Sequence, residues 1–142
     1  MTRAIVGQEK SIKSVMDNDR ARIFRNSEQR AIDLVSNILK AKGVQKNIGA
    51  FDWLRGDTGM RLRVDAYFPA EGLVLEYHGA QHFRASNLMD RRKGRAEQRR
   101  RYTKMRQKLI PKHNLKLFEI RYDEPLTHDH IRQRLLRLGY KV

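Results

Sequence analysis

The stretch Arg61-Leu-Arg-Val-Asp-Ala-Tyr-Phe-Pro-Ala-Glu-Gly-Leu-Val-Leu-Glu-Tyr-His-Gly-Ala-Gln-His-Phe83 predicts two short β-strands joined by a tight turn. Apolar residues alternate with other residues along both halves, which is typical of strands with one buried face. Between the halves, Pro69-Ala-Glu-Gly72 supplies a residue with a fixed φ and a residue that tolerates positive φ, as a β-turn requires. The stretch therefore predicts an antiparallel hairpin.

The register of this hairpin follows if Phe68 lies opposite Leu73 at the turn. The apolar residues of both strands then share one face, and Asp65 lies opposite Glu76 on the other. Two carboxylates in such a pair, with Cβ atoms roughly 5 Å apart, repel each other and destabilise a sheet. Two interpretations remain open: the pair belongs to a solvated face, or a divalent metal ion lies between the two side chains. The residues on this face are Arg63, Asp65, Tyr67, Val74, Glu76 and His78.

Three further polar residues follow Glu76 within six positions and favour the metal interpretation. Asp65 and Glu76 would supply the oxygen ligands that Mg²⁺ or Mn²⁺ prefers. His78 lies on the same face as Glu76, and its proton is mobile near neutral pH, so it could act as a general base or as a cation beside a phosphate. With Gln81 and His82, these residues form the candidate catalytic set of the hairpin.

The net charge is the strongest compositional feature of the chain. Its 142 residues include 31 Lys and Arg against 16 Asp and Glu, a formal charge of +15. Repulsion among so many positive charges destabilises a compact fold unless a polyanion binds it. We therefore expect nucleic acid as the first candidate partner and an anionic membrane as the second. No apolar run approaches the ~20 residues of a membrane span, and no signal-peptide core follows Met1. The absence of cysteine excludes disulfides and Cys-based zinc sites, and a cytoplasmic or nucleoid-associated location is expected.

A basic segment over residues 84–110 is the expected DNA-binding element. Between Arg84 and Lys108 there are eleven basic residues and two acidic ones. Helical spacing predicts a long helix that ends at Pro111, with one seam formed by Gln98, Tyr102, Met105 and Leu109. A basic run is often only a solvated face, but the density here indicates phosphate contacts, which position a duplex without reading its sequence. The expected DNA contacts are Arg61, Arg63, Arg91, Arg92, Lys93, Arg99, Arg100 and Lys104.

An earlier helix is predicted over residues 27–42, with Asn26 or Ser27 as its N-cap and Gly43 as its stop. Its apolar stripe should face the sheet and consists of Ala31, Ile32, Leu34, Val35, Ile38 and Leu39. Glu28 lies on the same side as this stripe, in the first turn. Two interpretations of Glu28 stay open: the helix dipole favours an acidic residue there, or its side chain faces the carboxylates of the hairpin.

The remaining segments complete an α/β or α+β fold, a small mixed β-sheet flanked by helices. A strand is predicted within residues 44–51 and a turn over 56–59. Residues 115–120 are apolar on both sides, which is typical of an interior strand, and Thr127 caps a final helix that Gly139 ends. Residues 27–142 form one domain, and residues 1–26 form a basic N-terminal arm that clamps DNA, contacts a second subunit or is simply frayed.

The pattern Asp65 … Leu-Val-Leu-Glu76-Tyr-His78-Gly-Ala-Gln81-His82-Phe resembles the restriction-endonuclease-like, or PD-(D/E)xK, nuclease superfamily. Its G-x-Q-H-F ending is similar to that of phage and homing nucleases related to the very-short-patch repair endonucleases. The resemblance covers about residues 27–138 and implies a restriction-endonuclease-like core with Mg²⁺-dependent hydrolysis of DNA phosphodiesters.

The resemblance also implies residue roles: Asp65 binds the metal, Glu76 is the acidic residue of the (D/E)xK element, and Glu28 is the helical glutamate found in many members. The chain departs from the family pattern in two places. Val64 rather than proline precedes Asp65, and His78 stands where the family has lysine. The lysine's role would pass to His78 or to Lys104 on the basic helix, with Gln81 and His82 contributing.

Two hypotheses of different classes follow. The first is a small metal-dependent DNA endonuclease that acts on a specific site, a mismatch or a branched duplex. The second is a catalytically silent basic protein that binds nucleic acid through the same surface. An RNA-associated factor ranks third, because no pair of strands carries the aromatic residues on which RNA bases stack. A dimer is compatible with the first hypothesis, since cutting both strands of a duplex requires two active sites.

Overall fold

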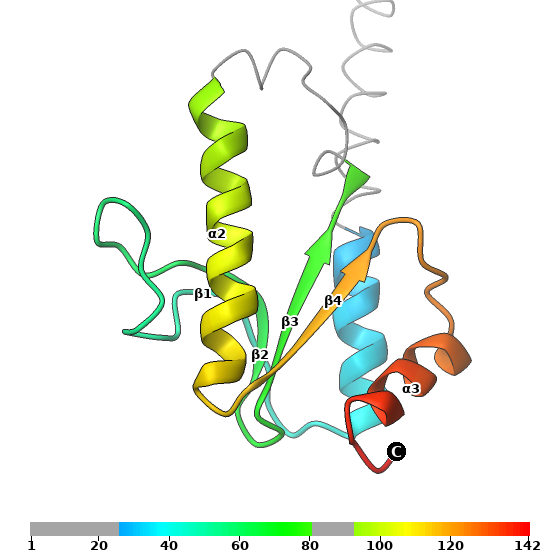
Figure 1. Cartoon of the computed structure of the whole chain (residues 1–142). Coiled ribbons are helices and arrows are strands. Elements are labelled where there is room, and N and C mark those ends of the chain that lie inside the picture. The colour runs from blue at the N-terminus through cyan, green and yellow to red at the C-terminus, as the bar shows by residue number, and fades with distance from the viewer. Residues whose placement is uncertain (1–25, 81–92) are drawn as a thin grey trace, which may run out of the picture.

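The computed structural model describes residues 26–80 and 93–142 and confirms the predicted class, a four-stranded mixed sheet with helices on both faces. A helix over residues 26–39 comes first. The elements that follow are β1 (Gln45–Ile48), β2 (Val64–Phe68), β3 (Leu73–His78), α2 (Lys93–Lys112), β4 (Lys116–Arg121) and α3 (His128–Arg137). The strands lie in the order β1-β2-β3-β4; the first three are antiparallel neighbours, and β3 pairs with β4 in parallel (Figure 1).

The hairpin of β2 and β3 forms with the predicted register. Phe68 lies opposite Leu73, and Ala66 lies opposite Leu75. Gly72 adopts a φ of 61°, and its N–H donates to the Pro69 carbonyl over 3.3 Å. The positive φ explains why the turn contains glycine at this position.

The sheet is covered on both faces. The first core cluster joins the helix over 26–39 and α3 to one face, through residues that include Val35, Phe68, Phe118 and Leu135. The second cluster joins α2 and the β1–β2 loop, residues 49–63, to the other face, where Leu54, Val74 and Ile110 are fully buried. The carboxylate-bearing face of the hairpin is therefore not a solvated surface, because α2 lies against it (Figure 1).

Two predicted boundaries and one predicted position were wrong. The first helix ends at residue 39 instead of 42, because Lys40 takes a φ of 52° and the Ala41 N–H reaches back to the Ser36 carbonyl. Pro111 does not end α2 but lies inside its last turn. The strand predicted as interior, β4, is at an edge of the sheet in the described part of the chain.

The edge position of β4 is compatible with its apolar pattern because helices cover both of its faces. Phe118 and Ile120 enter the first core cluster, and Leu117 packs against the second. The final helix begins as predicted, with the Thr127 hydroxyl accepting the His130 N–H over 3.3 Å. Among the described helices, none has the length and apolar character needed to cross a lipid bilayer.

Candidate functional site

Asp65, at the start of β2, lies beside two glutamates, and we call these three residues the three-carboxylate site. Glu76 lies near the end of β3 and Glu28 in the first turn of the helix over 26–39, and both interact with the Asp65 side chain through its charge and a hydrogen bond. Asp65 itself accepts the Tyr77 N–H over 2.7 Å, which fixes its carboxylate against β3. The sequence-predicted residues Glu28, Asp65 and Glu76 are thus brought together from three separate elements.

The environment of these carboxylates opposes full ionisation. Desolvation, then the charge of Asp65 and a hydrogen bond with its side chain, raises the pKa of Glu28 to about 7. Burial, with the Asp65 charge second, raises the pKa of Glu76 well above its usual range, although the Arg106 charge opposes this shift. Closely spaced carboxylates in a desolvated site retain protons unless a cation compensates their charge.

Asp65 and Glu76 are the candidate ligands for a hard divalent cation. Glu76 is only 7% exposed, and its Oε1 is buried without a hydrogen-bond partner. Among the described residues, no group of three or more His, Asp or Glu side chains could hold a metal ion. The Asp65 carboxylate accepts the Tyr77 N–H. One or two carboxylates completed by water are the usual protein contribution to a Mg²⁺ site, so Asp65 and Glu76 would hold the ion.

Arg106 is the cation that the structure brings to this site. It extends from the buried side of α2, where its Nε lies 3.4 Å from Glu76 Oε1 and its guanidinium donates to the Arg63 carbonyl over 3.0 Å. Lys104, which the sequence suggested for this role, is exposed on another side of the helix. Helical periodicity could have indicated this position of Arg106. Arg106 is one turn after Tyr102 and one turn before the buried Ile110, so it lies on the same side of α2 as these two residues.

His78 is held by a carboxylate that the sequence analysis missed. Its Nε2 lies 2.7 Å from Glu119 Oε2, and Gln107 donates to both Glu119 oxygens over 3.1 Å. The His78 hydrogen bond, assisted by the Gln107 bond and opposed by desolvation, lowers the pKa of Glu119. Glu119 is the register partner of Glu76 across β3 and β4, so the hydrogen-bonded pair of His78 and Glu119 directly borders the three-carboxylate site. The alternation of Leu115, Leu117 and Glu119 along β4 was the available signal.

The other predicted site residues fall in three groups. Gln81, His82, Arg91 and Arg92 lie outside the described residues, as does the side chain of Lys93 at the start of α2. Arg61 and Arg63 are exposed near the start of β2, and Arg61 pairs with Asp52. Arg99 is half-buried on α2, whereas Arg100 and Lys104 are exposed there.

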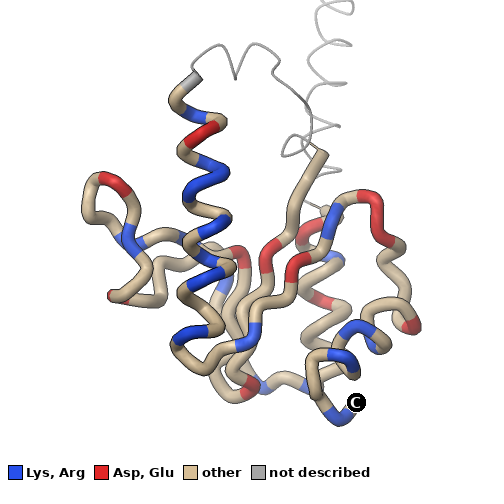
Figure 2. The backbone as a smooth tube through the Cα atoms, in the orientation of Figure 1, with Lys and Arg blue, Asp and Glu red and all other residues tan. Residues whose placement is uncertain are grey.

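The exposed side of α2 carries a basic row, which we define as Arg100, Lys104 and Lys108. Their four-residue spacing places them on one face of the helix, and all three are exposed. Figure 2 shows basic residues along most of α2, with Glu97 as its acidic exception. This row lies on the element that also delivers Arg106 to Glu76, so the basic surface and the carboxylates share one helix.

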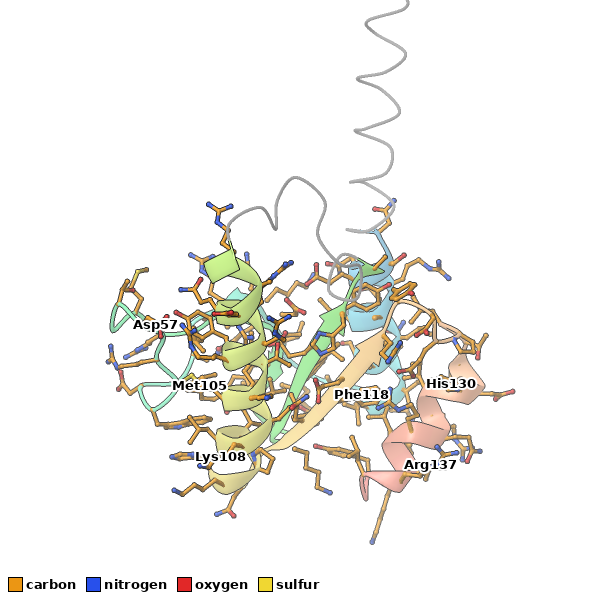
Figure 3. The ribbon with its side chains drawn as sticks, turned by 45° about the horizontal axis from the view of Figure 1, so that its top comes forward. Asp57, Met105, Lys108, Phe118, His130 and Arg137 are labelled. Atoms are coloured by element: carbon orange, nitrogen blue, oxygen red, sulfur yellow. The ribbon has the colours of Figure 1, made fainter. Side chains whose placement is uncertain are left out.

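The β1–β2 loop is fixed beside this helix. The Asp57 N–H donates to the Tyr102 hydroxyl over 2.8 Å, and its carboxylate accepts from Gln98 over 3.3 Å and pairs with Arg101 (Figure 3). These hydrogen bonds, the one from Gln98 first, lower the pKa of Asp57. Arg101 therefore anchors the loop that presents Arg55 and Arg61.

Comparison of the chain with protein-family models, with curated proteins and with solved structures finds no match. The chemistry of the site therefore has to be inferred from its own residues.

Proposed function

We propose that the chain is a metal-dependent endonuclease that hydrolyses phosphodiester bonds of DNA, using Mg²⁺ or Mn²⁺. One observation carries the proposal: Glu28 and Glu76 each lie beside Asp65, the pKa of both glutamates is raised, and Glu76 Oε1 is buried without a hydrogen-bond partner. Charge repulsion and desolvation make this arrangement costly unless a cation is bound there.

Each part of the site has a role in this proposal. Asp65 and Glu76 would hold the ion, and Glu28 would bind a water beside them or accept a proton. A bound divalent cation supplies a water of lowered pKa and stabilises negative charge on the phosphodiester. His78, oriented by Glu119, stands where the resembled nuclease superfamily has lysine, and the basic row of α2 positions the duplex. Activity on DNA would place the protein in the cytoplasm or at the nucleoid.

Cleavage of supercoiled plasmid tests the proposal. The protein should nick or linearise the plasmid with Mg²⁺ or Mn²⁺ and not with EDTA. Asp65→Asn and Glu76→Gln should abolish cleavage, because each removes an anionic ligand at nearly constant shape, while DNA binding in a filter or gel assay persists. Asp33→Asn is the matched control, since Asp33 is an exposed carboxylate on the first helix that pairs only with Gln29 in the contacts seen. Cleavage that survives both site variants would refute the proposal.

A catalytically silent nucleic-acid-binding protein is the second candidate, and a specific observation favours it. In the described part of the chain the carboxylates do not already form a ligand set; Asp65 bonds Tyr77, and Arg106 lies against Glu76. This candidate predicts tight DNA binding with no cleavage of supercoiled, mismatched or branched DNA in either metal. RNA substrates in the same assay address the third class.

A further inference from the structure

The contact between Arg106 and Glu76 is incomplete. Arg106 Nε and Glu76 Oε1 are 3.4 Å apart, which is within reach of an ion pair but outside good hydrogen-bond geometry. Both atoms are buried, and neither has a hydrogen-bond partner among the described residues. Unsatisfied buried donors and acceptors are rare, and a facing pair of them indicates a position where other groups bind.

The rest of the Arg106 side chain is held in place. Its guanidinium donates to the Arg63 carbonyl over 3.0 Å, and its side chain is 20% exposed against 10% for that of Glu76. The neighbouring residues Met105, Leu109 and Ile110 pack α2 onto the sheet. The Arg106 Nε–H is therefore available for an acceptor while the guanidinium keeps its hydrogen bond to the Arg63 carbonyl, just before β2.

Among the residues that the structure describes, Arg106 is the arginine that lies against Glu76, and an arginine cannot lose its proton in a protein. In the absence of metal it is a permanent positive charge beside Glu76. Any divalent cation that binds Glu76 must compete with this charge, and once Glu76 is taken, the Arg106 Nε–H needs a new acceptor. An oxygen of a DNA phosphate is the acceptor that guanidinium groups prefer, and it is the anion that the proposed reaction brings to this site.

We propose that Arg106 is the resident counter-ion of Glu76 in the metal-free protein, and that it exchanges Glu76 for a phosphate oxygen of DNA when a divalent cation binds. This inference rests on the proposed function and deepens it. Arg106 thereby weakens binding of the cation in the absence of DNA and strengthens catalysis in its presence. Cation and substrate are bound together more favourably than either alone.

The test measures Mn²⁺ affinity and the rate of DNA cleavage. A structural defect would lower both, whereas the proposed exchange predicts that one rises and the other falls. Mn²⁺ binding to the full chain without DNA is measured by calorimetry, and plasmid cleavage is measured at saturating Mn²⁺. Arg106→Gln should bind Mn²⁺ at least about threefold more tightly than the unsubstituted chain, because a competing charge is gone. The same variant should cleave at least about tenfold more slowly, because a donor to the phosphate is gone. Arg106→Met, which preserves apolar packing, should show the same opposed changes.

Two controls separate charge from position. Arg106→Lys keeps the charge and should leave Mn²⁺ affinity within about twofold of the unsubstituted value. Lys104→Gln removes a charge from the exposed side of the same helix, where solvent screens it, and should also leave Mn²⁺ affinity unchanged within about twofold.

The outcomes distinguish this inference from the proposed function. If the unsubstituted chain binds Mn²⁺ and cuts DNA, but Arg106→Gln and Arg106→Met bind Mn²⁺ no more tightly, the exchange is refuted and the nuclease proposal stands. If the unsubstituted chain neither binds Mn²⁺ nor cuts DNA, both fall. Tighter Mn²⁺ binding with slower cleavage in both variants supports the exchange.

Discussion

Glu28 is the residue whose ionisation most directly reports the state of the carboxylate site. Its pKa is about 7 in the folded chain against an ordinary value of 4.5, because of desolvation first and the Asp65 carboxylate second. The folded state therefore holds a proton that the unfolded state loses between these two values. By linkage, this residue favours the folded state below about pH 4.5, and that contribution is lost as pH rises through 7.

A comparison of stability at two pH values tests this shift. The free energy of unfolding should fall between pH 5 and pH 8 more for the unsubstituted chain than for Glu28→Gln, whose side chain cannot ionise. Urea denaturation at both pH values without metal measures the difference, with Asp33→Asn as the control that should retain the full fall. An equal fall in Glu28→Gln would show that Glu28 titrates normally.

Glu119 and Arg106 explain how much of the site could be predicted from the sequence. Asp65 and Glu76 were predictable because alternation and one turn determine the register of a hairpin between neighbours in sequence. The contact of Arg106 with Glu76 depends on how α2 docks on the sheet, and the contact of Glu119 with His78 depends on the parallel pairing of β3 with β4. Both contacts join residues far apart in the chain. Periodicity could place Arg106 on the sheet-facing side of α2 and Glu119 on one face of β4, but it could not identify the residue that each of them contacts.

At the scale of elements, a polar network around one arginine adds to the apolar packing of α3 against β4. Arg134 donates to the Glu119 carbonyl over 2.7 Å and to both Glu124 oxygens, and its guanidinium lies over the Phe118 ring. His130 adds a contact of 2.9 Å to Glu124. Figure 3 shows His130 on α3 and Phe118 on β4, the two elements that this network joins.

Arg134→Met should lower the free energy of unfolding by about 1–3 kcal/mol, because the substitution removes the donor of the Glu119 carbonyl and one of the donors of the Glu124 carboxylate. Urea denaturation measures this loss. Arg137→Met is the matched control, since Arg137 is exposed on the same helix, and its effect should stay within about 0.5 kcal/mol. Equal effects of the two substitutions would refute the anchoring role of Arg134.

The docking of the β1–β2 loop on α2 is a second feature at this scale. A Cβ atom on Gly56 would lie 2.7 Å from the Tyr102 hydroxyl and 2.9 Å from Leu62 Cδ2, whereas a Cβ on Gly94 of α2 would meet nothing within 4 Å. Gly56 therefore permits the close approach of the loop to the helix.

Gly56→Ala should destabilise the chain by about 1–3 kcal/mol through this overlap, whereas Gly94→Ala should stabilise it by roughly 0.5–1 kcal/mol, because alanine favours helix. Thermal unfolding of both variants measures the pair of changes. A neutral Gly56→Ala would show that the loop does not rest on Tyr102.

At the scale of elements the sequence predicted most of the fold. The hairpin, the apolar stripe of the first helix and the Thr127 cap depend on neighbouring residues, and all three are confirmed. The position of β4 at the edge was not predictable from its composition. Its two apolar faces reflect coverage by helices rather than by neighbouring strands.

At the scale of the whole molecule, a net charge of +15 and the basic row on α2 predict a strong salt dependence of DNA binding. The logarithm of the affinity should fall with the logarithm of salt concentration by about 0.9 for each phosphate contact. The variant with Arg100→Gln, Lys104→Gln and Lys108→Gln should reduce this slope by roughly 2–3 if each residue contacts one phosphate. Fluorescence anisotropy from low to physiological salt measures both slopes.

The matched control for the basic row changes three basic residues near the C-terminus to glutamine: Arg132 and Arg137 of α3, and Lys141 after it. This variant loses the same charge on a different surface, and its slope should stay close to that of the unsubstituted chain. Equal slopes for the two triple variants would show that overall charge, and not the basic row, determines binding.

Anomalous diffraction from crystals grown with Mn²⁺ tests the central claim most directly, because it locates the ion without reference to activity. The convergence of Glu28, Asp65 and Glu76 predicts an anomalous peak within coordination distance of Asp65 and Glu76, absent from crystals of Asp65→Asn grown in the same way. A protein that is ordered in this region and shows no Mn²⁺ peak there would contradict the claim that these carboxylates form a metal site.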